Sequence, residues 1–267
     1  MGVVNVTPDS FSDGGRPQGV EGAVAHALAL DRAGADILDI GGESTRPGAA
    51  PVSVESELGR VLPVLHNLRP LTRRRISVDT CKPEVARAAV QAGADIWNDV
   101  TALAAPGAAD LAAGLGCEVV LMHMQGEPRT MQAAPRYDDV LAEVCAFLGA
   151  RAGAALAAGI ARERIWLDPG IGFGKTVDHN LTLLAGLERI VALGFPVLLG
   201  ASRKRFIAAV GAGGELASDR LGGSLAAALS GAGAGVAAVR VHDVAETVQA
   251  LDVQAAIRAA GGLSPGR

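Results

Sequence analysis

Short runs of apolar and β-branched residues alternate with longer segments of helical periodicity along the whole chain. Most of the runs are continuously apolar, which is typical of parallel strands covered on both faces. Each run is followed by a segment in which we expect a helix. The eight runs lie at 3–6, 37–40, 76–78, 96–100, 119–124, 165–167, 197–199 and 236–241.

The clearest helical pattern covers residues 54–68, and Pro63 inside it predicts a kink. Its apolar residues recur at the spacing of one helix face. They are Val54, Leu58, Val61, Leu62, Leu65 and Leu68.

Repeated strand–helix units predict an α/β fold, specifically a closed (β/α)8 barrel. An open, doubly wound sheet is the alternative, because parallel strands can also form a flat sheet. The length of 267 residues suits a barrel in one domain, and no linker-like change in composition marks a boundary within 1–267. Met1 stands inside the first apolar run, so we expect the first strand to be short.

Composition narrows the classes of function. The net charge of −4 and pI near 5.7 give no basic surface for nucleic acid or an anionic membrane. Cys81, Cys117 and Cys145 form no CxxC pair, which fits a reducing interior. Neither a signal peptide nor an apolar run of about 18 residues is apparent. We therefore expect a cytoplasmic protein that takes small molecules.

Polar side chains lie at or near the carboxyl ends of the predicted strands. In a barrel these ends share one mouth, where active sites are built. Turn chemistry could explain each residue alone, but the set together predicts a polar site. Its members are Asn5, Asp39, Asp79, Asn98, His123, Asp168, Ser202 and His242.

Asp79, Asn98 and Asp168 form the acidic and amide part of this set. A carboxylate in a barrel mouth is costly unless it is hydrogen-bonded or paired. The N–H/NH₂ edge of an amino-pyrimidinone ring would suit it, because that edge offers two parallel donors. The alternative for Asp79 and Asp168 is an N-cap of the following helix.

Basic residues form two further candidates. Arg203, Lys204 and Arg205 begin a predicted helix, where positive charge is unfavourable, so the run predicts a bound anion or polar ligand. A solvated helix start is the alternative. Arg240 and His242 alternate on the last predicted strand and would point the same way.

Arginine is a natural bidentate partner of phosphate, and barrels often bind phosphate near their last two strands. Arg46 lies in the loop GGESTRPGA, residues 41–49, whose hydroxyls and glycines suit such a site. Arg46, Arg240 and His242 therefore predict a phosphate site. For Arg240, an ion pair with a neighbouring helix is the alternative.

The first fifteen residues carry the most specific signal. They begin as a strand and continue, beyond Asn5, as a loop rich in Ser, Asp and Gly. The stretch NVTPDSFSDGG resembles the first signature loop of the dihydropteroate synthases. These folate-pathway enzymes join a dihydropterin diphosphate to para-aminobenzoate. Further stretches resemble the same family in the same order: GGESTRPGA, VDT, IWNDV, LDPGIGFGK, GASRKRF and RVHDV.

The resemblance implies the barrel fold and assigns roles to particular residues. The implied catalytic residues, which neutralise the leaving diphosphate or contact the pterin, are Arg46, Lys204, Arg240 and His242. The implied substrate-binding residues also include Thr45, Asp79, Asn98, Met122, Asp168, Phe173, Ser202 and Arg203. Asp79, Asn98 and Asp168 would hold the pterin's polar edge, and Ser202 and Arg203 would face the aminobenzoate.

The resemblance further implies Mg²⁺ near Asn5, bridging the diphosphate oxygens. One amide oxygen cannot hold Mg²⁺ alone, so substrate oxygens and water must complete the shell. The loops at 7–19 and 42–52 are expected to close over the aminobenzoate. The family also implies a homodimer. Arg205 departs from the family, where Ser is common at this position.

Two other functions remain open. A corrinoid-linked methyltransferase shares the barrel and the pterin pocket, although the Arg46 loop and the Ser-Arg-Lys segment favour the synthase. A non-catalytic pterin-binding paralogue would keep the same motifs. His26, His66 and His179 lack an acidic partner at metal spacing, so we expect structural or exposed roles for them. His123 is ambiguous.

Overall fold

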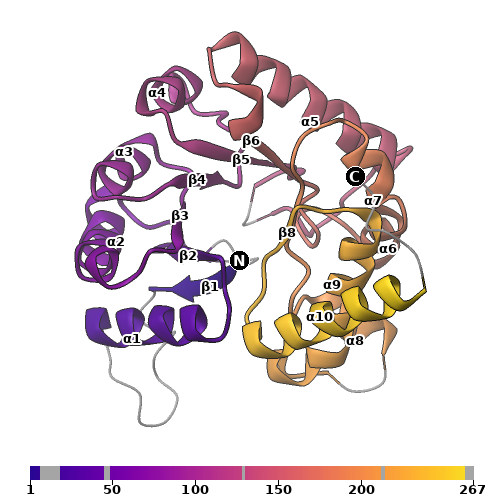
Figure 1. Ribbon diagram of the computed structural model, residues 1–267. Coiled ribbons are helices and arrows are strands. Elements are labelled where there is room, and N and C mark those ends of the chain that lie inside the picture. The colour runs from indigo at the N-terminus through magenta and orange to yellow at the C-terminus, as the bar shows by residue number, and fades with distance from the viewer. Residues whose placement is uncertain (7–18, 45–48, 128–129, 212–213, 262–267) are drawn as a thin grey trace.

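The computed structural model describes residues 1–6, 19–44, 49–127, 130–211 and 214–261. Parallel strands form an inner ring, and the helices lie around it (Figure 1). The strands are β1 Gly2–Asn5, β2 Ile37–Gly41, β3 Arg75–Asp79, β4 Ile96–Asp99, β5 Glu118–Met122, β6 Ile165–Asp168, β7 Leu198–Leu199 and β8 Ala238–Val239.

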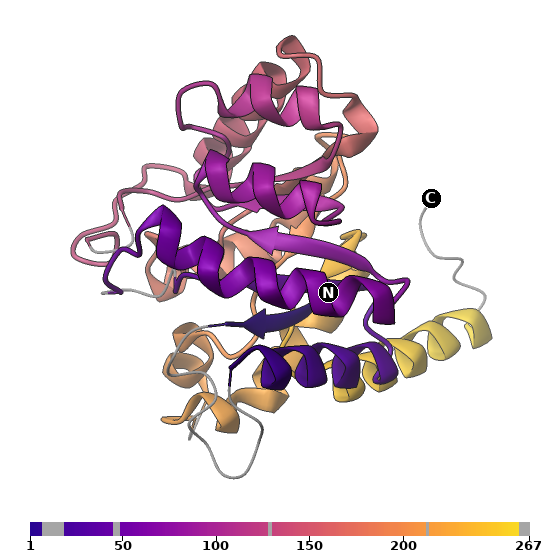
Figure 2. The ribbon, with the colours of Figure 1, turned by 90° about the vertical axis from the view of Figure 1, so that its left-hand side faces the viewer.

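The described helices alternate with these strands. Viewed from the side, the arrow of β1 points to one end of the molecule and the last helix ends at the other (Figure 2). The helices are α1 Gly19–Arg32, α2 Val54–Leu68, α3 Pro83–Gln91, α4 Ala108–Leu115, α5 Val140–Ala157, α6 Val177–Ala185, α7 Leu187–Val191, α8 Arg205–Val210, α9 Leu221–Ala234 and α10 Val244–Ala260. Short 3₁₀ turns are η2 Arg69–Leu71, η3 Arg162–Arg164 and η4 Ala217–Arg220.

The ring of strands is closed. Strands β1 to β6 form one parallel sheet in chain order, and β7 pairs with β8. A bridge between Leu167 and Val197 joins β6 to the segment before β7, and a bridge between Gly2 and Val241 joins β1 to the segment after β8. The predicted (β/α)8 barrel is therefore confirmed, and the open sheet is excluded.

The last two strands are shorter than the sequence predicts. We expected strands at 197–199 and 236–241, whereas β7 and β8 each have two residues. Residues on either side still hydrogen-bond along the ring, as in the bond from the Val241 N–H to the Met1 carbonyl at 2.9 Å. An apolar run therefore marked the position of each strand but not the length of its regular pairing.

Helix α2 spans the predicted 54–68 and continues past Pro63. Its buried face differs from the prediction, however. Val61, Leu65 and Leu68 are buried as expected, but Glu57 and Val64 are buried in place of Val54, Leu58 and Leu62. Apolar spacing alone could not identify a glutamate as a buried residue.

Among the described helices, only α5 is long and apolar enough to cross a membrane. One face of α5 is buried in the barrel's core, through residues such as Val144 and Leu148. Its apolar composition is thus accounted for by packing in the barrel.

Candidate active site

The strand register places the predicted polar residues at one level of the barrel. Asn5 pairs with Gly41 on β2, Gly41 pairs with Asp79 on β3, and Asp79 pairs with Asn98 on β4. A Cβ added at Gly41 would contact the Asp79 side chain at 3.5 Å. Asn5, Asp79 and Asn98 therefore lie at the same level near the carboxyl end of the strands.

Arg240, just after β8, joins two buried carboxylates across the mouth. Its Nε lies 2.6 Å from Asp39 Oδ2, and its Nη2 lies 2.7 Å from Asp79 Oδ2. Asp39 is fully buried, and its Oδ1 accepts a longer bond from Asn98 Nδ2 at 3.4 Å. Burial alone would lower the pKa of the Arg240 guanidinium, but Asp39 and Asp79 raise it, so the arginine stays charged. Arg240 is thus ion-paired, but with strand residues and not with the neighbouring helix that the alternative expected.

Asp79 keeps one carboxylate oxygen without a partner. Burial raises the pKa of this carboxyl to about 7, against the opposing effect of Arg240. Its Oδ1 is buried and has no hydrogen bond among the described residues. Asp79 does not cap α3, because the N-cap of that helix is Lys82. A buried acceptor without a donor fits a ligand that donates N–H groups.

Asp168 ends β6 and faces Lys204. Its Oδ1 accepts a hydrogen bond from the Gly170 N–H at 2.7 Å, so it shapes the following loop rather than capping α6, whose N-cap is Thr176. Burial raises the pKa of the Asp168 carboxyl, and Lys204 opposes the rise. Burial lowers the pKa of the Lys204 ammonium to about 8, and Asp168 opposes that fall. The two groups are thus opposite charges in one buried site.

The Lys204 ammonium lies over the Phe173 ring, 4.6 Å from its centroid, and also donates to the Ile171 carbonyl. Met122, on β5, is buried and pairs in register with Asp168. The two apolar residues expected beside the acidic set, Met122 and Phe173, are therefore brought close to Asp168 and Lys204.

The three basic residues after β7 have separate environments. Arg203 has a left-handed backbone, φ +58°, and forms a two-pronged ion pair with Asp243. The Lys204 ammonium donates to the Ile171 carbonyl, and of the three only Arg205, the first residue of α8, is exposed. The Arg203 charge is therefore balanced by Asp243, whereas binding of an anion or polar ligand by this basic run stays a prediction.

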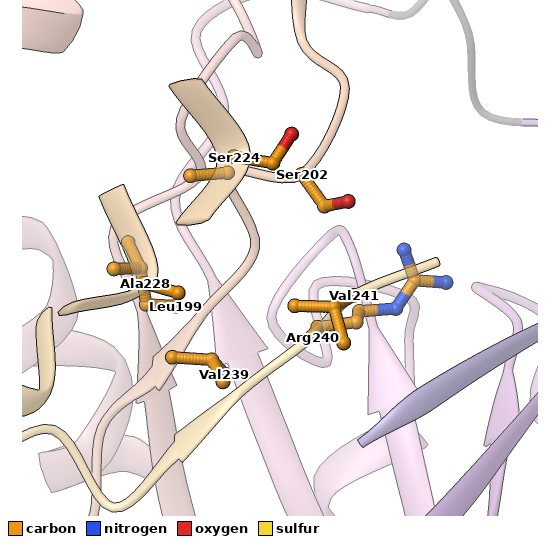
Figure 3. Close-up of a pocket in the computed structure, with 8 residues that line it drawn as sticks. Leu199, Ser202, Ser224, Ala228, Val239, Arg240 and Val241 are labelled. Carbon is orange, nitrogen blue, oxygen red and sulfur yellow. The ribbon is translucent and has the colours of Figure 1, made fainter. Parts of the chain in front are cut away.

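Ser202 and His242 lie together on the same side of the mouth. The hydroxyl of Ser202 is 3.1 Å from His242 Nδ1 and accepts a bond from the His242 N–H at 3.3 Å. Ser202 and Arg240 line one small hollow, and their polar ends lie away from its apolar residues Leu199 and Val239 (Figure 3). Since β8 ends at Val239, Arg240 and His242 lie beyond it rather than alternating within it.

A larger hollow of about 300 Å³ lies at the amino end of the strands, beside Met1, Arg75 and Trp166. None of the predicted site residues lines it. The predicted polar residues instead gather at the carboxyl ends of the strands, at the opposite end of the barrel.

Lys175, the last residue of the stretch LDPGIGFGK, was given no role in the sequence analysis. It is 3% exposed, and its Nζ lies 2.9 Å from His123 Nδ1. Burial lowers the pKa of His123 to about 3, with Lys175 adding to the effect, so the imidazole is neutral. Its Nδ1 can therefore accept a hydrogen bond from Lys175 Nζ. The ambiguous His123 is thus a buried acceptor, whereas His179 takes the predicted structural role in the capping box of α6.

A second missed cluster lies behind the mouth. Lys82 Nζ is 2.5 Å from Glu43 Oε2 and 2.6 Å from Glu57 Oε2, and Glu43 Oε1 accepts the Val52 N–H at 2.8 Å. Glu43 and Val52 lie on either side of the loop that holds Thr45 and Arg46. The signal in the sequence was a glutamate at helical spacing from apolar core residues.

We expect Lys82→Met to lower the free energy of unfolding by about 3–5 kcal/mol, because it leaves the fully buried Glu57 without a cation. Urea unfolding would measure this loss. In a Glu57→Leu background the same substitution should cost much less, because no buried charge remains. Equal costs in both backgrounds would contradict the ion-pair explanation.

Thr45 and Arg46 lie outside the described residues, as do most residues of the two loops expected to close the site. Asn5 is half-buried at the end of β1. Within the described ranges, no three His, Cys, Asp or Glu residues are arranged to hold a metal ion. Mg²⁺ at Asn5 therefore stays a prediction, in which substrate oxygens and water would complete the shell.

Comparison with known proteins identifies the family of this chain. A sequence profile of the family described as "Pterin binding enzyme" matches residues 1–242. The dihydropteroate synthase of Escherichia coli K12 is 52% identical over 253 residues, which cover 95% of this chain and 89% of that protein. The chain belongs to the dihydropteroate synthase family. The resemblance carried by the first loop is confirmed.

Solved dihydropteroate synthase structures share the fold. The Xanthomonas albilineans enzyme with 4-aminobenzoic acid has a TM-score of 0.92 at 57% identity, covering 97% of this chain and 92% of that one. The Burkholderia cenocepacia enzyme complexed with 7,8-dihydropteroate has a TM-score of 0.89 at 46% identity, covering 99% and 92%. These similarities are to synthases, which settles the choice against the corrinoid-linked methyltransferase.

Proposed function

We propose that the barrel mouth binds a dihydropterin diphosphate and para-aminobenzoate and joins them into dihydropteroate with release of diphosphate. The observation that carries this proposal is the pair of buried carboxylates, Asp79 and Asp168, facing one mouth, with Asp79 Oδ1 unpartnered. Solved relatives were obtained with 4-aminobenzoic acid and with 7,8-dihydropteroate. The whole chain, 1–267, would work as one barrel domain.

Asp79, Asn98 and Asp168 would bind the polar edge of the pterin. Carboxylate oxygens accept hydrogen bonds from ring N–H and amino groups, and such charge-assisted bonds are strong in a buried site. Met122 and Phe173 would contact the flat faces of the ring system, and Lys204 would donate to a ring acceptor. This arrangement leaves the pterin's methylene carbon facing the open side of the mouth.

Arg46, Arg240 and His242 would neutralise the diphosphate as it leaves. The C–O bond to diphosphate breaks, the arylamine nitrogen forms a C–N bond to the methylene carbon, and the amine gives up a proton. Positive charge developing on the pterin would be stabilised by Asp79 and Asp168. Thr45, Ser202 and Arg203 would line the aminobenzoate side, where the Ser202–His242 contact fixes the hydroxyl.

We place Mg²⁺ against Asn5 when the diphosphate is bound. The ion would draw charge away from the leaving diphosphate oxygens, and those oxygens with water would complete its shell. Asn5 fits this role because its amide oxygen suits a hard cation. No other ligand is required from the chain.

The test of the proposal is an assay of dihydropteroate formation from dihydropterin diphosphate, para-aminobenzoate and Mg²⁺. Product and diphosphate should appear together, and only when both substrates and Mg²⁺ are present. Pterin binding without release of diphosphate would instead identify a non-catalytic paralogue. Failure to bind a pterin would refute the proposal as a whole.

We expect Asn5→Ala to raise the Mg²⁺ concentration needed for half-maximal activity by roughly tenfold or more, since one ion contact is lost. Mg²⁺ titrations of turnover would measure this. Pterin affinity without Mg²⁺ should be unchanged, and the exposed Asn67→Ala serves as the control. An unchanged Mg²⁺ requirement would contradict the assignment of Asn5 as a Mg²⁺ ligand.

We also propose that the protein is a cytoplasmic homodimer, as the family implies. Exposed apolar side chains on α10, Val253 at 54% and Ile257 at 67%, support a covered surface on this helix. Light scattering coupled to gel filtration would give the mass in solution. A monomer at micromolar concentration would contradict the homodimer.

A further inference from the structure

The loop between β6 and α6 is held by side chains from several parts of the chain. Four consecutive carbonyl oxygens each accept a hydrogen bond from a different side chain, which gives a loop without regular structure a fixed backbone. The donors are Lys204 to Ile171 O, Gln132 Nε2 to Gly172 O at 2.5 Å, Lys175 Nζ to Phe173 O at 2.9 Å, and Tyr137 Oη to Gly174 O at 2.8 Å.

Lys175 is the most buried of these donors and also reaches the neighbouring loop. Besides Phe173 O, its ammonium group contacts His123 Nδ1 at 2.9 Å and the His123 carbonyl at 3.3 Å. An ammonium group has three protons, so these acceptors use its full capacity. His123 follows β5 and Phe173 follows β6, so one buried lysine, whose pKa burial lowers to about 7, joins the ends of two adjacent strands.

The backbones of the two loops pack directly against each other. A Cβ added at Gly170, φ +66°, would lie 1.9 Å from the His123 carbonyl oxygen. A Cβ added at Gly174, φ +60°, would lie 2.3 Å from the Gln125 carbonyl oxygen. No side chain can fit at these two contacts, so Lys175 provides a polar link where the loops are closest.

The loop tied by Lys175 carries groups of the proposed pterin pocket. The Phe173 ring lies under the Lys204 ammonium, and a Cβ added at Gly172 would meet the Lys204 side chain at 3.0 Å. The Gly170 N–H holds Asp168 Oδ1. A shift of this loop would therefore move the positions of Phe173, Lys204 and Asp168 together.

We propose that Lys175 is a positioning residue for the pterin pocket: by joining the loops after β5 and β6, it fixes Phe173, Lys204 and Asp168 for ligand binding. The proposal rests on the proposed function, because it takes the pocket's ligand to be a pterin. Lys175 itself is buried behind this surface and acts through the loop rather than on the reacting atoms.

Replacing Lys175 with methionine tests this role. Methionine keeps an unbranched apolar stem but leaves three buried acceptors without donors, so the loops should separate. We expect the dissociation constant of a non-reactive pterin, measured by calorimetry, to rise by roughly tenfold or more. The KM for para-aminobenzoate at saturating pterin substrate should change by less than about twofold.

Two further variants separate positioning from folding. Gln132→Leu removes the exposed donor to the adjacent Gly172 carbonyl and should leave pterin affinity nearly unchanged. Lys175→Gln keeps a donor for one buried carbonyl, so it should recover part of the affinity lost in Lys175→Met. A purely structural role would instead lower the melting temperature of both Lys175 variants without changing the affinity of the folded protein.

The outcomes distinguish this inference from the proposed function. If Lys175→Met or Lys175→Gln folds and binds pterin as tightly as the unaltered chain, the positioning role is wrong and the proposed function stands. If the unaltered chain binds no pterin, both proposals fail. A weakened pterin affinity in both Lys175 variants, with an intact Gln132→Leu control, would support the role assigned to Lys175.

Discussion

Replacing Arg240 with methionine is expected to lower kcat/KM by roughly 10²–10³-fold and to reduce stability by about 3–5 kcal/mol. The loss of activity follows from its proposed place beside the leaving diphosphate. The loss of stability follows from Asp39 and Asp79, which would remain buried without their cation. Steady-state kinetics and urea unfolding would measure the two effects separately.

Adding Asp39→Asn and Asp79→Asn to Arg240→Met should restore stability but not turnover, because the unpaired charges are removed while the diphosphate contact and the Asp79 carboxylate of the pterin pocket are both absent. Arg73→Met, at an exposed position, is the matched control. Near-normal turnover by a folded Arg240→Met protein would refute the role of Arg240 at the diphosphate.

Asp168→Asn should weaken pterin binding on the order of 100-fold, because hydrogen bonds to a charged acceptor contribute about 1.5–3 kcal/mol each. The amide keeps the shape of the side chain, and its oxygen can still accept the Gly170 N–H. The NH₂ group of the amide, however, would face N–H donors of the proposed ligand, so a hydrogen bond is lost. Calorimetry with a non-reactive pterin would measure the change.

The same substitution should move the alkaline limb of the pH–rate profile to lower pH. Asp168 opposes the effect of burial on Lys204, whose pKa is about 8. Without this carboxylate the pKa of Lys204 falls further, so the ammonium loses its proton at a lower pH, and activity that needs the charged form is lost earlier. The exposed Asp178→Asn is the control, and an unchanged pH profile would contradict the Asp168–Lys204 pairing.

The sequence predicted the fold and the mouth because both depend on local, repeated patterns. Each parallel strand is an apolar run, and the polar residues at its carboxyl end lie near the mouth. Asp79 and Asp168 were found in this way. Arg240 was assigned to the diphosphate, but its contacts to Asp39 and Asp79 depend on how β8 meets β2 and β3, which no local pattern records.

The sequence did not predict which polar residues are buried for structural reasons. Glu57 lies between apolar positions of α2, and only its contact with Lys82, 25 residues later, explains its burial. Lys175 follows a glycine-rich loop, and no local pattern in the sequence predicts its burial. Its three acceptors lie on two loops and become neighbours only when the barrel closes. Contacts between distant segments are therefore what sequence patterns missed.

The two places where regular strand pairing in the barrel is interrupted lie beside its charged site. Regular pairing is interrupted between β6 and β7 and between β8 and β1, where single bridges connect the strands. Lys204, after β7, reaches back to Ile171, and Arg240, after β8, reaches forward to Asp39. These side chains therefore connect strands on opposite sides of both interrupted pairings. A pterin bound by groups on both sides would stabilise the closed ring of strands against local opening. Ligand binding and the stability of the barrel are therefore linked.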